Sequence, residues 1–147
     1  GYPRYETLQN LYNLYDRADF EQDLAPVLRQ EGISAIPYYG LASGFLTGKY
    51  RSQEDLQKSV RGSSIGPRYL TDKGLSILHA LDAVAARQQA TPAQVALAWL
   101  MQAPTVAAPI ASATSTAQVT ELLKAAELRL TAEDVQTLQQ AQPVNAA

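Results

Sequence analysis

The chain of 147 residues has no cysteine, a single histidine and no long apolar run. Without cysteine it can form neither disulfides nor thiolate metal sites. A cysteine-free chain fits a reducing cytosol, and we expect a cytoplasmic protein, although this absence alone does not identify a compartment. The only histidine, His79, lies in a helical pattern with no second histidine beside it, so we expect no metal site. No stretch reaches the roughly 18 apolar residues of a membrane-spanning helix.

Charge is also scarce. The formal net charge is −2 and 18% of the residues are charged, which gives no reason to expect nucleic acid or a membrane surface as a partner. A hydrophobic fraction of 46% is typical of a globular domain with one sizeable core. The sequence has no initiator methionine and no signal pattern, and its first expected strand begins almost at once. We therefore expect a fragment.

Strand and helix patterns alternate along the chain. Short apolar runs predict strands over 6–9, 33–38 and 105–110. Helical periodicity, hydroxyl caps and capping boxes predict helices over 20–30 and 75–85 and from Thr91, Ser115 and Thr131. The apolar residues expected to face inward from these helices include Leu24, Val27, Leu28, Val119, Leu122, Leu123, Val135 and Leu138.

This order predicts βαβ units and a parallel sheet, with the loops that follow the strands on one face, where such folds bind ligands. Residues 51–69 are polar and contain Gly, Ser and Pro, so we expect a long loop there. Residues 142–147 read as a loose tail.

The segment 37–50 is the most informative part of the chain. It follows an apolar strand and carries Gly44, Gly48 and Lys49, which together suit a phosphate group through backbone N–H groups and a cation. The pattern alone is also compatible with a simple turn. The sequence contains no Gly-x-Gly-x-x-Gly fingerprint, Walker loop or Gly-x-Ser-x-Gly elbow.

Three motifs, in order, resemble the aldo-keto reductase family. They are 9–14 (Gln-Asn-Leu-Tyr-Asn-Leu), 36–50, and 91–100 followed by 109–118. The resemblance covers about Pro3 to Leu138 and implies an α/β fold. It implies a single domain, 1–147, made of about three βα units, strands six to eight, from the C-terminal part of a (β/α)8 TIM barrel.

The resemblance also implies a site for NADP(H) or NAD(H). Gln9 would bind the nicotinamide carboxamide and Tyr38 would stack on its ring. The remaining cofactor residues would be Leu41, Ala42, Ser43 and Lys49 at the pyrophosphate and ribose, and Ser112, Thr114, Gln118 and Glu121 around the adenosine. Arg61 or Arg68 would add a phosphate contact. The chain departs from the family at Tyr39-Gly40, at Ser112 and at Leu122, and 112–118 contains no basic residue for a 2′-phosphate.

Several of these residues also have plain structural interpretations. Tyr38 could be a packed residue at a strand end, Gln9 a satisfied amide and Lys49 a solvated lysine. A capping box accounts for Gln118 without any ligand. Trp99 is expected in the core.

The family's catalytic Tyr, Asp, Lys and His come from earlier strands that this chain does not contain. The resemblance therefore implies no catalytic residue here and an isolated chain that does not reduce aldehydes or ketones. The alternative is a non-catalytic remnant that binds nucleotide or only a partner protein. A part-barrel leaves open strand edges, so the expected partners are the missing N-terminal half as a separate chain, or further copies of this chain.

Overall fold

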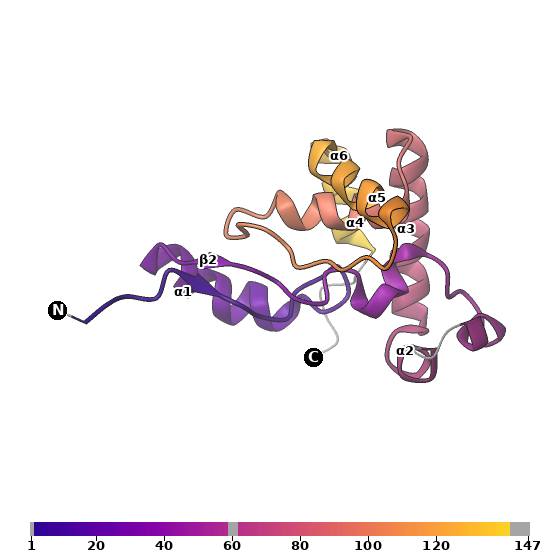
Figure 1. Cartoon of the computed structure of the whole chain (residues 1–147), viewed down its shortest axis with the longest axis horizontal. Coiled ribbons are helices and arrows are strands. Elements are labelled where there is room, and N and C mark those ends of the chain that lie inside the picture. Colours follow the sequence, from indigo (N-terminus) through magenta and orange to yellow (C-terminus); the bar gives the residue numbers. More distant parts are fainter. Residues whose placement is uncertain (1, 59–61, 142–147) are drawn as a thin grey trace.

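The computed structural model describes residues 2–58 and 62–141. Its elements are β1 (Thr7–Leu8), the π-helical turn η1 (Phe20–Leu24), α1 (Ala25–Glu31), β2 (Ser34–Ala35), the 3₁₀ segments η2 (Ala42–Thr47) and η3 (Glu54–Lys58), α2 (Gly62–Tyr69), α3 (Asp72–Gln88), α4 (Pro92–Met101), α5 (Thr116–Glu127) and α6 (Ala132–Gln140). The protein is therefore α/β and mostly helical. β2 and α1 lie at one end, α3 at the other, and α4, α5 and α6 gather between them (Figure 1). No helix of the described residues is both long and apolar enough to cross a membrane.

The sheet is small and parallel, as expected. Thr7 pairs with Ser34 and Leu8 with Ala35, and the connection between the two strands runs through α1. The pairing continues past the strands, since Tyr38 N donates to the Asn10 carbonyl at 2.9 Å.

The third expected strand does not form as a strand. Residues 105–110 instead run beside β2 as an extended segment with one bridge, Ala35 to Val106. Hydrogen bonds hold it there, from Ala107 N to the Ala35 carbonyl at 2.9 Å and from Ile110 N to the Pro37 carbonyl at 2.8 Å. Pro109 has no N–H to give, which interrupts the ladder. The expected place of this segment beside β2 is confirmed, but strand pairing is limited to Val106 and does not extend over the expected 105–110.

Helix α1 begins and ends as its sequence indicates. Pro26 lies in its first turn, and Gly32 closes it at φ 63°, a left-handed conformation that glycine adopts without strain. Leu28 is buried, but Leu24 and Val27 are 36% and 54% exposed. The expected inward face is therefore wrong at these two positions.

Residues 51–69 do not form the expected long loop, because η3 and α2 lie within them. Ile65 and Tyr69 are buried, and Gly66 lies against Leu56. These contacts turn a polar segment into a packed helical one. The expected tail, 142–147, lies outside the described residues.

The core centres on α3 and α4. Thr91 and Gln94 form the expected capping box of α4 through bonds of 3.3 and 3.0 Å. All residues from Gln94 to Leu100 are buried, including Trp99 as expected. The Thr131 cap and the inward positions of Val135 and Leu138 in α6 are also confirmed.

Helix α5 differs from this pattern. Ser115 caps it by accepting from Gln118 N at 3.3 Å, as expected. Val119 and Leu123 were expected to point inward but are 47% and 65% exposed, whereas Ala125 is buried. Leu122 packs against the core, as expected, so the expected inward face of α5 is confirmed at Leu122 and wrong at Val119 and Leu123.

Candidate cofactor-binding edge

Three parallel segments end at the same edge of the molecule. Tyr38 N bonds to the Asn10 carbonyl, and Ile110 N bonds to the Pro37 carbonyl. The end of the first segment, which includes Gln9, therefore lies beside the residues that follow the other two segments, 38–49 and 111–118. In parallel α/β folds this carboxyl edge is where ligands bind.

Gln9 and Tyr38 lie on adjacent segments at this edge. Gln9 is exposed, whereas its neighbour Asn10 is 7% exposed, because successive side chains of an extended segment point to opposite faces. Tyr38 is 37% exposed, and its ring meets Tyr39 edge-on at 5.3 Å. Both side chains can therefore reach a flat ligand.

The loop after Tyr38 has an unusual backbone. Tyr39, Ala42 and Ser43 have φ of 56°, 49° and 58°. A left-handed conformation costs a non-glycine residue roughly 1–2 kcal/mol, and such strain concentrates at functional sites. Gly40 allows close packing at the same point, since a Cβ there would lie 2.9 Å from Leu100 Cδ1.

Asn13 holds this loop in place. Its side-chain amide donates to the Tyr39 carbonyl at 3.0 Å and to Asp16 Oδ2 at 3.1 Å. Its Oδ1 accepts from Tyr15 N and Asp16 N at 2.8 and 2.9 Å, and the residue has no exposed surface. The sequence showed only an asparagine in the first motif and gave no indication that it fixes Tyr39.

The residues expected at the pyrophosphate differ in how far their side chains are exposed to solvent and to a ligand. Ala42 is fully buried, so it shapes the loop and offers no surface to a ligand in this conformation. Leu41 and Ser43 are partly exposed and Lys49 is exposed. Lys49 Nζ would lie 3.7 Å from a Cβ built on Gly44, so its ammonium sits beside the strained loop.

The segment expected at the adenosine is held by its own hydrogen bonds. Thr114 N and Oγ1 both contact Gln118 Oε1, at 2.8 and 3.2 Å. The Gln118 side chain therefore accepts from the backbone N–H of Thr114 and not from that of Ser115, the N-cap residue. The expected reciprocal capping box is wrong in this respect. Ser112 is exposed and makes no hydrogen bond to a described side chain that would hold it away from a ligand.

Glu121 lies apart from this group. Its Oε1 accepts from Thr91 Oγ1 at 2.5 Å, and its carbonyl accepts from Gln94 Nε2 at 3.4 Å. The structure therefore gives Glu121 a role in joining α5 to the start of α4.

A polar cluster lies below the strained loop. Asp16 accepts from Arg68 Nη2 at 3.1 Å and from Tyr69 OH at 2.9 Å, so Arg68 is already paired. Burial, together with the Asp16 charge, raises the pKa of Tyr69. Tyr69 therefore retains its proton and is poorly suited to donate it. Arg61 lies outside the described residues.

Lys73 also belongs to this cluster. Its Nζ donates to the Tyr15 carbonyl at 2.9 Å and lies 4.2 Å from the Tyr15 ring centre. Burial lowers the pKa of Lys73. Within 2–58 and 62–141, no group of three or more His, Asp or Glu side chains could hold a metal ion.

Comparison with known proteins identifies the class to which this fold and edge belong. The model of the aldo/keto reductase family matches residues 1–143. A Glycine max protein named as an aldo-keto reductase is 30% identical over 138 residues, covering 90% of this chain and 38% of the relative. Protein tas of Escherichia coli is 34% identical over 136 residues, again covering 90% and 38%.

A solved structure shows the same fold. A thermostable aldo-keto reductase in complex with the inhibitor epalrestat aligns with a TM-score of 0.67 and 23% identity, covering 92% of this chain and 39% of that one. The chain belongs to the aldo/keto reductase family. It spans somewhat more than a third of the length of the curated relatives it matches.

Proposed function

We propose that this chain is the C-terminal, three-unit part of an aldo-keto reductase barrel and that it holds a nicotinamide dinucleotide, NADP(H) or NAD(H). The observation that carries the proposal is the meeting of three loops at one carboxyl edge, with a strained backbone and Lys49 in the central loop. A backbone of this kind can turn its N–H groups toward an anion, and an adjacent ammonium stabilises it.

The residues present fit such a cofactor. Gln9 and Tyr38 would hold the nicotinamide, Ser43 and Lys49 the pyrophosphate, and the loop with Ser112 and Thr114 the adenosine. Leu41 and Gln118 would lie beside the cofactor at the same edge. When bound, the cofactor supplies a hydride for the reduction of an aldehyde or ketone.

The same proposal assigns no catalytic residue to these 147 residues. The Tyr, Asp, Lys and His that the family uses are expected on strands this chain lacks. Tyr69 does not replace the missing acid, because it is 2% exposed and its pKa is raised by burial. The isolated chain should therefore bind cofactor without reducing carbonyl compounds. Its cytoplasmic location stays a prediction.

The choice between the two nucleotides follows from charge. A 2′-phosphate is normally paired with Arg or Lys, and 112–118 contains neither. We therefore expect NADPH and NADH to bind with similar affinity.

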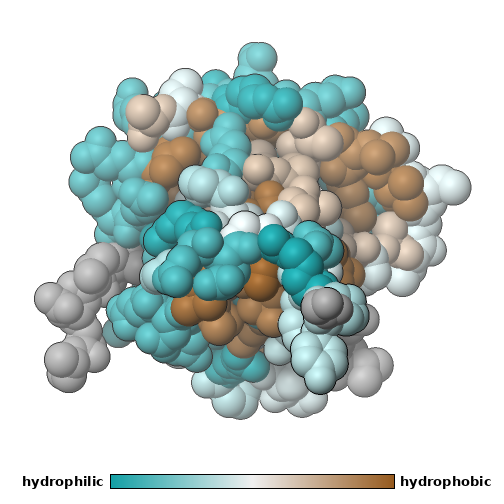
Figure 2. Space-filling model, turned by 90° about the vertical axis from the view of Figure 1, so that its left-hand side faces the viewer, coloured by the Kyte–Doolittle hydropathy of each residue, from teal (hydrophilic) through white to brown (hydrophobic). Residues whose placement is uncertain are grey.

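The remainder of the barrel is the partner that the proposal implies. Apolar side chains are exposed on both flanks, Leu24 and Val27 on α1 and its preceding turn, and Val119 and Leu123 on α5. Asn10 Oδ1 is buried without a hydrogen-bond partner in the described residues. Figure 2, viewed from the end that carries α1, shows apolar patches between hydrophilic ones.

Strand number favours one partner over the other. Copies of a three-unit segment cannot add up to the eight strands of a closed barrel, whereas a five-unit segment completes it. We therefore favour a complementary N-terminal part, on the same polypeptide or a separate one, over self-association.

Titration of the chain with NADPH, followed by the fluorescence of the reduced nicotinamide, tests the proposal. We expect saturable binding. Lys49→Gln should weaken it about tenfold, since a hydrogen bond to a charged group contributes roughly 1.5–3 kcal/mol. Lys124→Gln, an equal change of charge on exposed α5, is the matched control.

Three outcomes distinguish the alternatives. Equal affinity for Lys49→Gln and the unmodified chain would remove Lys49 from the site. No binding at all would favour the non-catalytic remnant that only contacts a partner. Ordinary carbonyl turnover by the pure chain would show that the catalytic group is not missing.

A further inference from the structure

A cavity lies between α1, α4 and α6. Its volume is about 340 Å³, within the range of sites for small organic molecules. None of the ten residues that the sequence analysis expected at the cofactor lines it. A ligand there would not depend on the proposed function of the edge.

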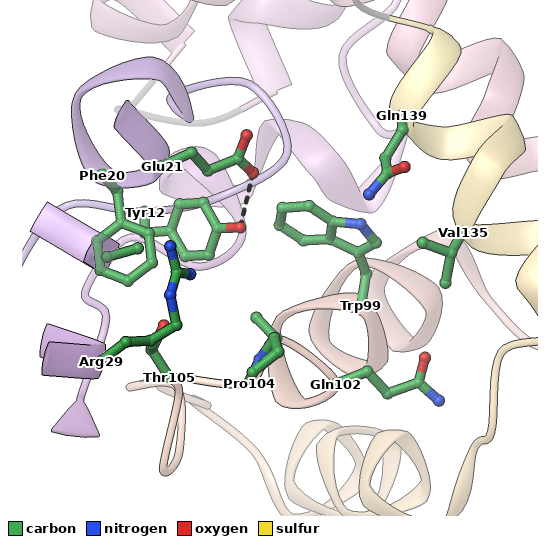
Figure 3. A pocket seen from close by; sticks show the side chains of 12 residues that line it. Tyr12, Phe20, Glu21, Arg29, Trp99, Gln102, Pro104, Thr105, Val135 and Gln139 are labelled. Carbon is green, nitrogen blue, oxygen red and sulfur yellow. Dashed lines mark hydrogen bonds between the residues drawn. The ribbon is translucent and has the colours of Figure 1, made fainter. Parts of the chain in front are cut away.

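One wall of this cavity is aromatic. The Tyr12 ring lies 4.2 Å from Phe20 and 5.3 Å from Trp99, measured between ring centres. Figure 3 shows Tyr12, Phe20 and Arg29 on one side of the opening and Trp99, with Gln139, on the other. These rings contact one another, and a flat apolar ligand in the cavity can pack against the surface they form.

The carboxylate in the cavity is already satisfied. Glu21 accepts from Tyr12 OH at 2.9 Å and from Arg17 Nε and Nη2 at 2.8 and 3.0 Å. Burial and the neighbouring Glu21 raise the pKa of Tyr12, so its hydroxyl stays protonated. Glu21 therefore does not make the cavity a site for a cation.

Three hydrogen-bond donors remain unused. Arg29, Trp99 and Gln139 line the cavity, and their side chains make no hydrogen bond or ion pair with a described residue. Arg29 and Gln139 are exposed, whereas Trp99 is 5% exposed. An unpaired guanidinium, an indole N–H and an amide all favour a ligand that accepts hydrogen bonds. Of these three groups only the Arg29 guanidinium is charged, and its positive charge favours an anion.

We propose that this cavity binds a small planar aromatic carboxylate. The ring packs against the wall of Tyr12, Phe20 and Trp99, and the carboxylate pairs with Arg29. The indole N–H of Trp99 and the amide of Gln139 remain for a hydroxyl or carbonyl substituent on the ring.

Benzoate is the probe for this proposal, and NMR provides the readout. Trp99 is the only tryptophan, so its indole N–H gives a single resonance that reports directly on the cavity. We expect benzoate to shift this resonance saturably. Cyclohexanecarboxylate, which has the charge without the aromatic ring, and benzyl alcohol, which has the ring without the charge, should both bind more weakly.

Arg29→Gln should weaken benzoate binding about tenfold, the loss expected for a charge-assisted hydrogen bond. Arg29→Lys keeps the charge without the planar fork and should fall between Arg29→Gln and the unmodified chain. Lys124→Gln changes the charge equally on distant α5 and should bind as the unmodified chain does.

Two results would overturn the proposal. One is the absence of a saturable shift in a chain whose amide spectrum shows it to be folded. The other is equal affinity of Arg29→Gln, or of benzyl alcohol in place of benzoate, because either result would show that no carboxylate pairs with Arg29. Loss of binding in Arg29→Gln with an unchanged amide spectrum supports the assignment.

Discussion

Helices α4 and α5 begin in the same way and end up in different environments. Thr91 and Ser115 cap them with the same type of hydroxyl-to-backbone bond. Every residue from Gln94 to Leu100 is buried in α4, whereas Ala125 is the buried residue of α5. Local sequence starts both helices, and packing then separates them.

The neighbours of the two helices explain the difference. α4 packs between α3 and α5, whereas α5 packs chiefly against α4 alone. The outer side of α5 presents Val119 and Leu123 to solvent. The best-packed helix thus lies at the centre of this chain, whereas its flanks expose apolar side chains.

Truncation in α4 should show the largest effect. Leu100→Ala removes a side chain with no exposed surface and should lower the free energy of unfolding by about 3 kcal/mol. Leu123→Ala, the same change at a position 65% exposed, should cost less than about 0.5 kcal/mol. Urea unfolding of both variants measures the difference. Equal losses would mean that α5 is as tightly packed as α4.

The next largest expected effect on the free energy of unfolding comes from the hydrogen bonds that tie α6, in contrast to α5, to its neighbour. Asp134 joins α6 to α3 from a buried position, accepting from Arg87 Nη2 at 2.8 Å and from Thr131 N at 3.0 Å. Burial raises the pKa of Asp134, but the hydrogen bonds from Thr131, Arg87 and Gln88 outweigh it and lower the pKa to about 2. The equivalent tie of α5, from Glu121 to Thr91, is less buried.

The folded pKa of Asp134 lies below its unfolded value, so its contribution is present above about pH 4 and is lost as the pH falls toward 2. We expect a loss of about 2 kcal/mol over that window, measured by unfolding at a series of pH values. Asp134→Asn should be less stable at neutral pH and should lack this part of the pH dependence. An unchanged acid slope in Asp134→Asn would assign the effect to other carboxylates.

Local rules in the sequence predicted the caps and most helix boundaries. The Thr91, Ser115 and Thr131 caps and the stop at Gly32 each depend on a few adjacent residues, which is why sequence suffices. Periodicity identified the apolar stripe of α5 but not what covers it. Val119 and Leu123 were therefore expected inside and lie outside.

Contacts between residues that are far apart in the sequence could not be predicted from the sequence. The helix α2 depends on Ile65 and Tyr69 packing into the core, and nothing in the polar composition of 51–69 indicates this. The candidate cofactor-binding edge likewise combines local motifs, which the sequence reveals, with long-range contacts, which it does not. Motifs located Gln9 and Tyr38, but the bond from Asn13 that fixes the Tyr39 backbone spans 26 residues and required coordinates.

Substitutions on the two flanks should have the smallest effect on stability and the clearest effect on assembly. Val27→Lys and Leu123→Lys lie on exposed surface, so each should change the free energy of unfolding by less than about 0.5 kcal/mol. If the flanks receive the remainder of a barrel, each lysine introduces an unpaired charge into that interface and should weaken assembly.

Mixing the chain with the part of Escherichia coli Protein tas that it does not match, and measuring mass by light scattering, provides the test. Thr120→Lys, at another exposed position of α5, is the matched control and should assemble normally. If both flank variants assembled as well as this control, the apolar flanks would not be the surface that receives the proposed remainder of the barrel.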